Sequence, residues 1–202
     1  MNRWWRRIVI GALVAIGAVQ LGSGLYIHAK AWLAQALIAK SWASTLDGAR
    51  EVRPWPWADT WPAARLKVPS VAADLYVLAD ASGRSLAFGP GFLSGSAQPG
   101  MNGNTIIAAH RDTHFRFLRD VAIGAAVELQ TPDGRLHRYR VVDAQIMDVR
   151  FDRLAVETDR PTLSLVTCYP FDAVVPGGPL RYVAVAEKLD PRVPSPEGRG
   201  TG

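Results

Sequence analysis

The single cysteine of the chain, Cys168, carries the side chain best suited to act as a nucleophile. It closes the apolar, β-branched run 162–168 and is followed by Tyr169 and Pro170, so the thiol lies at the end of a predicted strand. A lone cysteine forms no disulfide within its own chain, which leaves a nucleophile and an inert buried residue as the two interpretations. Catalysis would also require a proton donor and a group that stabilises an oxyanion.

The four histidines are the candidates for the proton donor. His110 ends the apolar run 104–109, where a strand would hold its ring rigidly at the rim of a sheet. His114 follows in a loop or helical turn, where exposure is the default, and spacing alone favours His110 over it. We expect His28 at a membrane boundary and His137 in solvent among arginines.

Arg181 could supply the third group, because it opens the last predicted strand just after the Pro-Gly-Gly-Pro segment 176–179. An arginine at a strand start is more often solvated or salt-bridged, and spacing alone leaves both interpretations open. His110 and His114 share an i, i+4 spacing, but without a helix or a third ligand they make a poor metal site. The acidic stretch 143–159 lacks the spacing of a calcium loop. We therefore expect no metal and no cofactor.

Short apolar segments separated by turn residues dominate the chain from residue 65 onward. We expect one short helix over 115–121 and strands at 65–68, 75–78, 84–88, 104–109, 127–130, 136–147, 162–168 and 181–186. Seven or eight short strands without alternating long helices predict an all-β closed barrel or sandwich over residues 65–188. Residues 189–202 are rich in Pro, Gly and charge, which predicts a disordered tail.

The charge of the chain is divided unevenly along its length. The net charge is +5, and residues 1–60 carry seven Lys or Arg against three Asp or Glu, whereas residues 61–202 carry 16 against 15. A nucleic-acid binder would carry its basic patch on the folded domain, so this distribution argues against nucleic acid as a partner.

Residues 1–28 predict a cytoplasmic tip and one membrane-spanning helix. Residues 8–27 form an uncharged, mostly apolar run long enough to cross the hydrocarbon core of a bilayer. Arg3, Arg6 and Arg7 precede it, with two tryptophans among them, which is typical of a cytoplasmic N-terminus beside an interfacial aromatic belt. A cleaved signal peptide is the alternative, but its apolar stretch is usually shorter. We expect a single-pass inner-membrane protein whose C-terminal domain faces the periplasm.

Residues 29–64 are expected to join the membrane helix to the barrel. The alanine-rich stretch 29–42 has apolar residues near helical spacing, which favours a juxtamembrane continuation of the same helix. The segment 53–57 reads Arg-Pro-Trp-Pro-Trp, and alternating prolines preclude a regular helix there. We interpret it as an extended linker whose indole rings dock on the domain or lie near the membrane interface.

Three segments in order resemble the motifs of the sortase family of cysteine transpeptidases. In chain order they are the histidine segment 108–112 (AAHRD), the cysteine run 163–171 (LSLVTCYPF) and the arginine strand 180–183 (LRYV), and the loop 89–97 also looks sortase-like. The separations of 58 residues from His110 to Cys168 and 13 from Cys168 to Arg181 fit that family. The resemblance covers about residues 65–188 and implies a sortase-like closed barrel. The single N-terminal anchor with its Trp/Pro stalk, and the lack of a C-terminal membrane segment, look like the proteobacterial subgroup called class GN.

The resemblance also implies a reaction. The Cys168 thiolate would attack a sorting-signal peptide bond, typically Thr–Gly in an LPXTG-like motif, to form a thioacyl intermediate. His110 would act as general acid and then base, and Arg181 would stabilise the oxyanion. An amine acceptor would release the acyl group. The residues of the cysteine motif expected to contact the substrate are Ser164, Thr167 and Tyr169.

Two positions depart from the family pattern, and two other functions remain as alternatives. Ser164 stands where the motif usually has threonine, and Ala109 where glycine is common, so we expect altered packing and retained chemistry.

An L,D-transpeptidase or other cysteine peptidase would place a histidine close before the cysteine, but none lies between His137 and Cys168. A non-catalytic anchored β-barrel adaptor would bury the thiol. A sorting-signal-bearing protein and an amine are the expected partners of a monomer.

Overall fold

The computed structural model describes residues 3–175 and 177–189, and the chain divides into two compact units between Leu37 and Ile38. The predicted disordered tail 189–202 lies outside the described residues except for Leu189, whose amide donates to the carbonyl oxygen of Arg138 at 2.8 Å.

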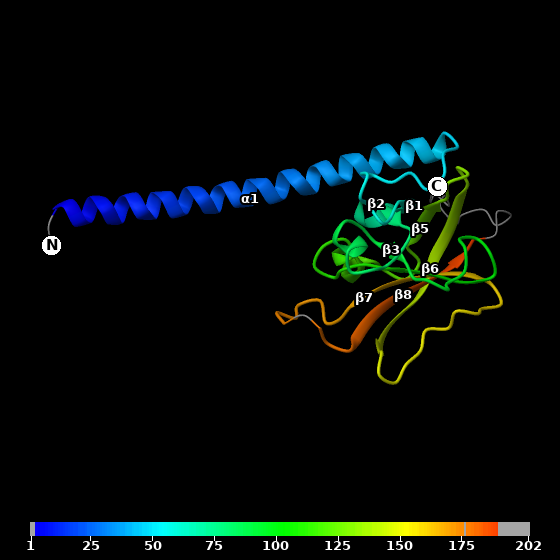
Figure 1. The fold of residues 1–202 in the computed structure, drawn as a ribbon. Coiled ribbons are helices and arrows are strands. Elements are labelled where there is room, and N and C mark those ends of the chain that lie inside the picture. The colour runs from blue at the N-terminus through cyan, green and yellow to red at the C-terminus, as the bar shows by residue number, and fades with distance from the viewer. Residues whose placement is uncertain (1–2, 176, 190–202) are drawn as a thin grey trace, which may run out of the picture. The chain divides into compact units, whose positions relative to one another are not determined.

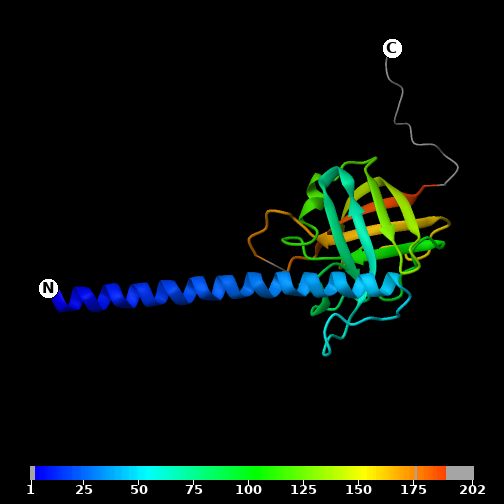
Figure 2. The same cartoon turned by 90° about the horizontal axis from the view of Figure 1, so that it is seen from above.

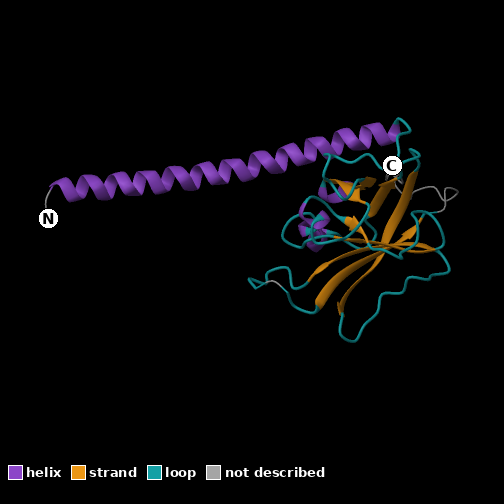
Figure 3. Ribbon diagram, in the orientation of Figure 1, coloured by secondary structure: helices purple, strands orange, loops and turns teal. Residues whose placement is uncertain are grey.

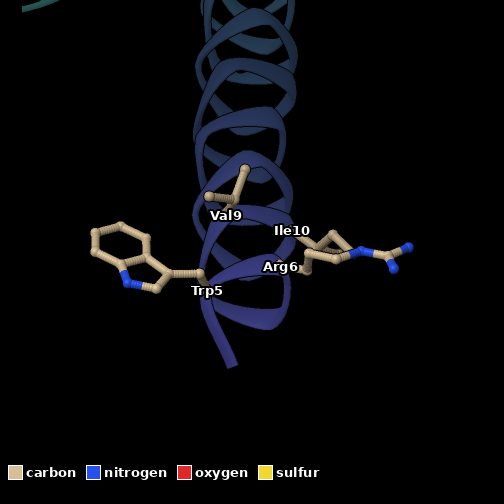
Figure 4. Close-up of a pocket in the computed structure, with 4 residues that line it drawn as sticks. All are labelled: Trp5, Arg6, Val9 and Ile10. Atoms are coloured by element: carbon tan, nitrogen blue, oxygen red, sulfur yellow. The ribbon is translucent and has the colours of Figure 1, made fainter. Parts of the chain in front are cut away.

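One helix, α1 (Arg3–Leu46), spans the boundary between the two units and continues the apolar run into the juxtamembrane segment without a break. It is the one helix among the described residues that is long and apolar enough to cross a membrane, with a mean hydropathy of 2.1 in an 18-residue window. Figure 4 shows Trp5 and Arg6 near its N-terminus pointing to opposite sides of the helix. The hollow lined by Trp5, Arg6, Val9 and Ile10 is formed by one helix alone.

The last turns of α1 belong to the second unit and pack there. Ile38 and Trp42 are 1% and 2% exposed, and the Trp42 ring lies 6.4 Å from the ring of Tyr76. In the Pro/Trp segment that follows, Trp55 packs edge-on against Phe88 with ring centroids 4.9 Å apart. Trp57 is 82% exposed. One indole of the linker therefore docks on the barrel, whereas a second is open to its surroundings.

Eight strands close into a barrel in the order β1-β2-β3-β4-β7-β8-β6-β5 (Figures 1 and 2). The strands are β1 Pro62–Val68, β2 Ala73–Leu78, β3 Gly91–Phe92, β4 Gly103–Ala108, β5 Ala126–Gln130, β6 Leu136–Asp148, β7 Pro161–Cys168 and β8 Leu180–Lys188. Strand pairs β2–β3 and β4–β7 are parallel and the other pairs are antiparallel. The predicted closed all-β barrel with one long apolar N-terminal helix is confirmed.

The barrel core follows from the period-2 alternation of apolar side chains. In β1 every second residue is buried, as an antiparallel strand with one face on a core requires. The short 3₁₀ helix η3 (Arg116–Asp120) lies in the segment expected to be helical, and Phe115 and Leu118 beside and within it are both fully buried. Their rings and methyl groups join the main core, so the loop that follows His110 is anchored five and eight residues further on.

One expected strand is wrong. Residues 84–88 form a turn around the 3₁₀ helix η2 (Ser85–Ala87), not a strand (Figure 3). The Asp80 carboxylate accepts hydrogen bonds from the Ser82 amide and the Ser85 hydroxyl at 2.8 Å each, which closes the chain locally and competes with an extended ladder. The two-residue strand β3 follows instead, where Gly91 passes so near the Asp80 carbonyl that a Cβ would collide with it.

Candidate functional site

Parallel pairing brings the ends of β4 and β7 to the same edge of the barrel. Ala108 pairs with Val166, and the next amide, that of Ala109, donates to the Val166 carbonyl at 3.1 Å. The Thr167 hydroxyl donates to the Ala109 carbonyl at 2.8 Å. One residue beyond each of these groups come His110 and Cys168. Both line one pocket of about 120 Å³, with His110 exposed and Cys168 partly buried.

Arg181 lies beside Cys168 on the next strand. The antiparallel register of β7 and β8 places the two residues directly opposite one another, so their side chains share one face of the sheet. The Arg181 guanidinium is turned back, because its Nη1 donates to the carbonyl oxygens of Gly178 and Leu180 at 2.8 Å each. The ten described residues that line the pocket do not include Arg181. The structure thus brings all three predicted residues to one edge, with Arg181 outside the pocket.

Two charged residues in the same pocket were not identified from the sequence. Arg111 is 6% exposed, although arginine is normally a surface residue, and its neighbour Asp112 binds it through two hydrogen bonds of 2.7 and 3.0 Å. These bonds are the largest cause of the raised pKa of Arg111, and the nearby Cys168 makes a smaller contribution in the same direction. The pKa of Asp112 is lowered, chiefly by Arg111 and also by His110. The only sequence signal was an Arg-Asp pair directly after the candidate histidine.

The three residues expected to contact substrate lie in different surroundings. Ser164 and Thr167 are 0% and 2% exposed, which is incompatible with direct contact by their side chains and corrects that expectation. The reason is the strand itself, since β7 lies between β4 and β8, and five of its eight residues, Ser164 and Thr167 among them, are buried. Tyr169 does line the pocket, and its ring lies edge-on to Phe171 at 6.0 Å, while Phe171 lies 5.1 Å from Tyr182.

The other histidines of the domain are less exposed than the sequence suggested. His114 is partly buried, and its pKa is lowered first by that burial and then by the electrostatic effect of the neighbouring His110. His137, expected in solvent, is partly buried beside Gly100, which lowers its pKa, and its Nε2 lies 3.3 Å from the Thr131 hydroxyl. Within the described ranges no three His, Cys, Asp or Glu side chains gather as a metal site would require.

The end of β6 forms a charged turn next to the same edge. Met147 pairs with Arg181, and Asp148 pairs with Leu180. The Asp148 carboxylate accepts hydrogen bonds from the Arg150 amide at 3.0 Å and from its guanidinium at 2.9 and 2.6 Å. These bonds lower the pKa of Asp148 to about 2 from its ordinary value of 3.8.

We expect Asp148→Asn to lower the stability of the domain near neutral pH and to lower it much less at pH 2. A carboxyl whose pKa is lower in the folded than in the unfolded chain stabilises the fold above the unfolded value, and this contribution is lost as pH falls from 3.8 to about 2. Urea unfolding of the full chain in detergent, followed by tryptophan fluorescence, would measure the difference from pH 2 to 7. Arg150→Ala removes the partner of Asp148, so its difference in stability from the wild type should also shrink as pH falls. A difference in stability that stays constant down to pH 2 would contradict a lowered pKa of Asp148.

Comparison with known proteins finds relatives of this domain. The family model described as "Sortase domain" matches residues 66–189. Sortase D of Bacillus subtilis (strain 168) is 28% identical over 125 residues, which cover 61% of this chain and 62% of that protein. The chain thus spans somewhat less than two thirds of the curated relative it matches.

Solved structures agree on the fold. Sortase A from Corynebacterium diphtheriae superposes with a TM-score of 0.60 and 25% identity, covering 73% of this chain and 70% of that one. A Clostridium perfringens sortase D5 transpeptidase superposes with a TM-score of 0.58 and 18% identity, covering 75% of this chain and 89% of that one. At 18% identity, the likeness to the Clostridium perfringens structure concerns the fold alone.

Proposed function

The chain belongs to the sortase family, and we propose that it is a membrane-anchored cysteine transpeptidase. Its substrate would be a protein that carries an LPXTG-like sorting signal, and its second substrate an amine. The observation that carries the proposal is the meeting of His110 and Cys168 in one pocket, with Arg181 directly opposite Cys168 across the β7–β8 pair.

The reaction would proceed through a thioester on Cys168. Its sulfur attacks the threonyl carbonyl carbon of the Thr–Gly bond, and collapse of the tetrahedral intermediate breaks the C–N bond. His110 gives a proton to the departing glycyl nitrogen. An incoming amine then attacks the thioester carbonyl, His110 accepts a proton from that amine, and the sulfur leaves. Water in place of the amine would give hydrolysis.

Arg181 would stabilise the negative oxygen of each tetrahedral intermediate. Its position opposite Cys168 supports this role, because an extended side chain on the same face can reach an oxygen bonded to the attacked carbon. The Arg181 guanidinium would exchange the two carbonyl acceptors that now hold it for the oxyanion. A charged donor gains most from an acceptor that carries a full charge, so this exchange would occur in the transition state.

The partial exposure of Cys168 supports a catalytic function over a non-catalytic adaptor. A buried, inert thiol is the ordinary alternative for a lone cysteine. Cys168 instead borders a pocket together with His110 and a buried arginine. Tyr169 lines the same pocket and is our candidate for direct substrate contact, while Ser164 and Thr167 would support the strand from within.

We further propose that α1 anchors the protein in the inner membrane as a single span. Arg3, Arg6 and Arg7 would stay in the cytoplasm, so the barrel would face the periplasm. The anchor and the Trp/Pro segment support membership of the class GN subgroup. The protein would act as a monomer.

The test is an acyl-transfer assay with the full chain in detergent micelles. Fluorogenic LPXTG-like peptides would be supplied with a panel of glycyl, lysyl and diaminopimelyl amines, and products identified by mass spectrometry. The proposal predicts cleavage at Thr–Gly and an amide joined to the amine. Absence of cleavage across the peptide panel, with Cys168 unreactive toward thiol reagents in the folded protein, would favour the adaptor instead.

A further inference from the structure

The segment after His110 and the loop after Cys168 are joined by one buried side chain. We propose that Arg111 is a positioning residue that holds the start of the β7–β8 loop, residues 169–175, in place as a wall of the pocket. The inference rests on the proposed function for its consequence in catalysis, but its structural part can be tested separately.

The contacts of Arg111 reach across the pocket from one loop to the other. Its Nη1 donates to the Pro170 carbonyl at 2.6 Å, and its Nη2 donates to the Ala173 carbonyl at 2.9 Å. Pro170 is two residues beyond Cys168, and both acceptor residues line the pocket. One guanidinium therefore fixes two points of the loop relative to the residue next to His110.

Asp112 orients this guanidinium from the other side. Its two carboxylate oxygens accept hydrogen bonds from Nε and Nη2 of Arg111 at 2.7 and 3.0 Å. Together with the two carbonyl contacts, this uses four of the five N–H donors of the arginine. The planar fork is thereby committed to two fixed directions, the carboxylate and the loop carbonyls, which a lysine ammonium could not reproduce.

Burial distinguishes a structural role of Arg111 from a role through charge alone. The side chain is 7% exposed, whereas that of its partner Asp112 is 68% exposed. A cation needed only for its field near Cys168 would not require two backbone acceptors at hydrogen-bond distance. Breaking these contacts leaves buried donors or loop carbonyls without partners, which favours a displaced loop over an intact one.

Other contacts hold the start of this loop segment but not its far end. The Tyr169 amide donates to the Leu180 carbonyl at 3.0 Å, which continues the β7–β8 ladder by one residue. Phe171 packs on Tyr182. Beyond it, Val174 and Val175 are 96% and 77% exposed and contribute little packing. Arg111 is thus placed where the loop passes from a packed to an open segment.

The decisive variant is Arg111→Lys, which keeps the positive charge and removes the fork. We expect kcat/KM for the peptide to fall about 10- to 100-fold, mainly through a higher KM, because the pocket wall is displaced while Cys168 and His110 remain. Amides of residues 171–175 should exchange hydrogen at least about 10-fold faster. Alkylation of Cys168 by iodoacetamide, a small neutral reagent, should change by less than about twofold.

Arg119→Lys is the matched control, because Arg119 and Asp120 also form a sequence-adjacent pair, at 3.6 Å, but on the surface. We expect it to leave all three measurements unchanged. If Arg111→Lys fails to fold, Asp112→Asn serves instead, since it leaves the arginine and loosens its orientation. Wild-type kinetics or unchanged exchange in the substituted chain would overturn the proposal. An inactive wild type would overturn the proposed transpeptidase function, and hydrogen exchange would still decide the role of Arg111.

Discussion

Replacing Cys168 with alanine is expected to abolish acyl transfer, with a fall in kcat/KM of at least about 10⁴-fold. The sulfur forms the covalent bond to the acyl group, and no other side chain in the pocket can replace it, because the chain has no second cysteine. Alanine occupies less space at the same partly buried strand end, so the barrel should remain folded. Initial rates with peptide and amine would be compared for the two proteins at equal concentration.

The same experiment has a direct chemical readout. Since Cys168 is the only thiol in the sequence, a thioester adduct in an intact mass spectrum can be assigned to it without peptide mapping. Wild-type protein mixed with peptide in the absence of amine should carry one acyl adduct, sensitive to hydroxylamine, and the alanine variant none. Circular dichroism and thermal unfolding would show that both proteins are folded. An alanine variant that transfers at the wild-type rate would rule out the covalent route.

The barrel could be predicted from local patterns because most of its strands are long enough to alternate. Seven of the eight expected strand segments correspond to observed strands, and β6 and β7 end within one residue of their predicted limits. The wrong segment, 84–88, has apolar residues but follows Asp80, whose carboxylate closes a turn. Strand β3 has only two residues, too few for any periodicity, and it exists because β2 and β4 both offer it a partner.

Some residues of the candidate site could be placed from local sequence patterns, whereas others depend on long-range contacts. His110, Cys168 and Arg181 each end or begin an apolar run, so their place at a barrel edge follows from the strands that carry them. The place of Arg111 does not, because its acceptors lie 59 and 62 residues further along the chain and are brought near by the parallel β4–β7 pair. Arginine is also among the residues least expected in a protein interior.

The burial of Ser164 and Thr167 shows the limit of reading roles from a motif. Both belong to the run that resembles the family cysteine motif, and both proved to be interior residues. The Thr167 hydroxyl binds the Ala109 carbonyl and so ties β7 to the residue before His110. We infer that such motif positions align the strand ends that carry the candidate catalytic residues His110 and Cys168.

Replacing Arg181 with alanine is expected to lower kcat by about 10²- to 10³-fold and to change KM much less. The reason is the charge on the reacting oxygen, which is small in the bound peptide and full in the tetrahedral intermediate. A donor that binds mainly the tetrahedral intermediate lowers the activation free energy without tightening the binding of the peptide. Steady-state kinetics with the peptide at saturating amine would separate the two parameters.

Two further variants decide whether position or charge at residue 181 matters. Arg181→Lys keeps a cation but loses the planar guanidinium, whose Nη1 now donates to Gly178 and Leu180, so we expect partial activity, between the wild type and the alanine variant. Arg160→Ala is the control, since Arg160 is 79% exposed and pairs loosely with Glu187 at 3.7 Å. It should stay within about twofold of the wild type. An Arg181→Ala variant that raises KM while keeping kcat would assign the residue to substrate binding, because its interaction would then be equally strong in the ground state and the transition state.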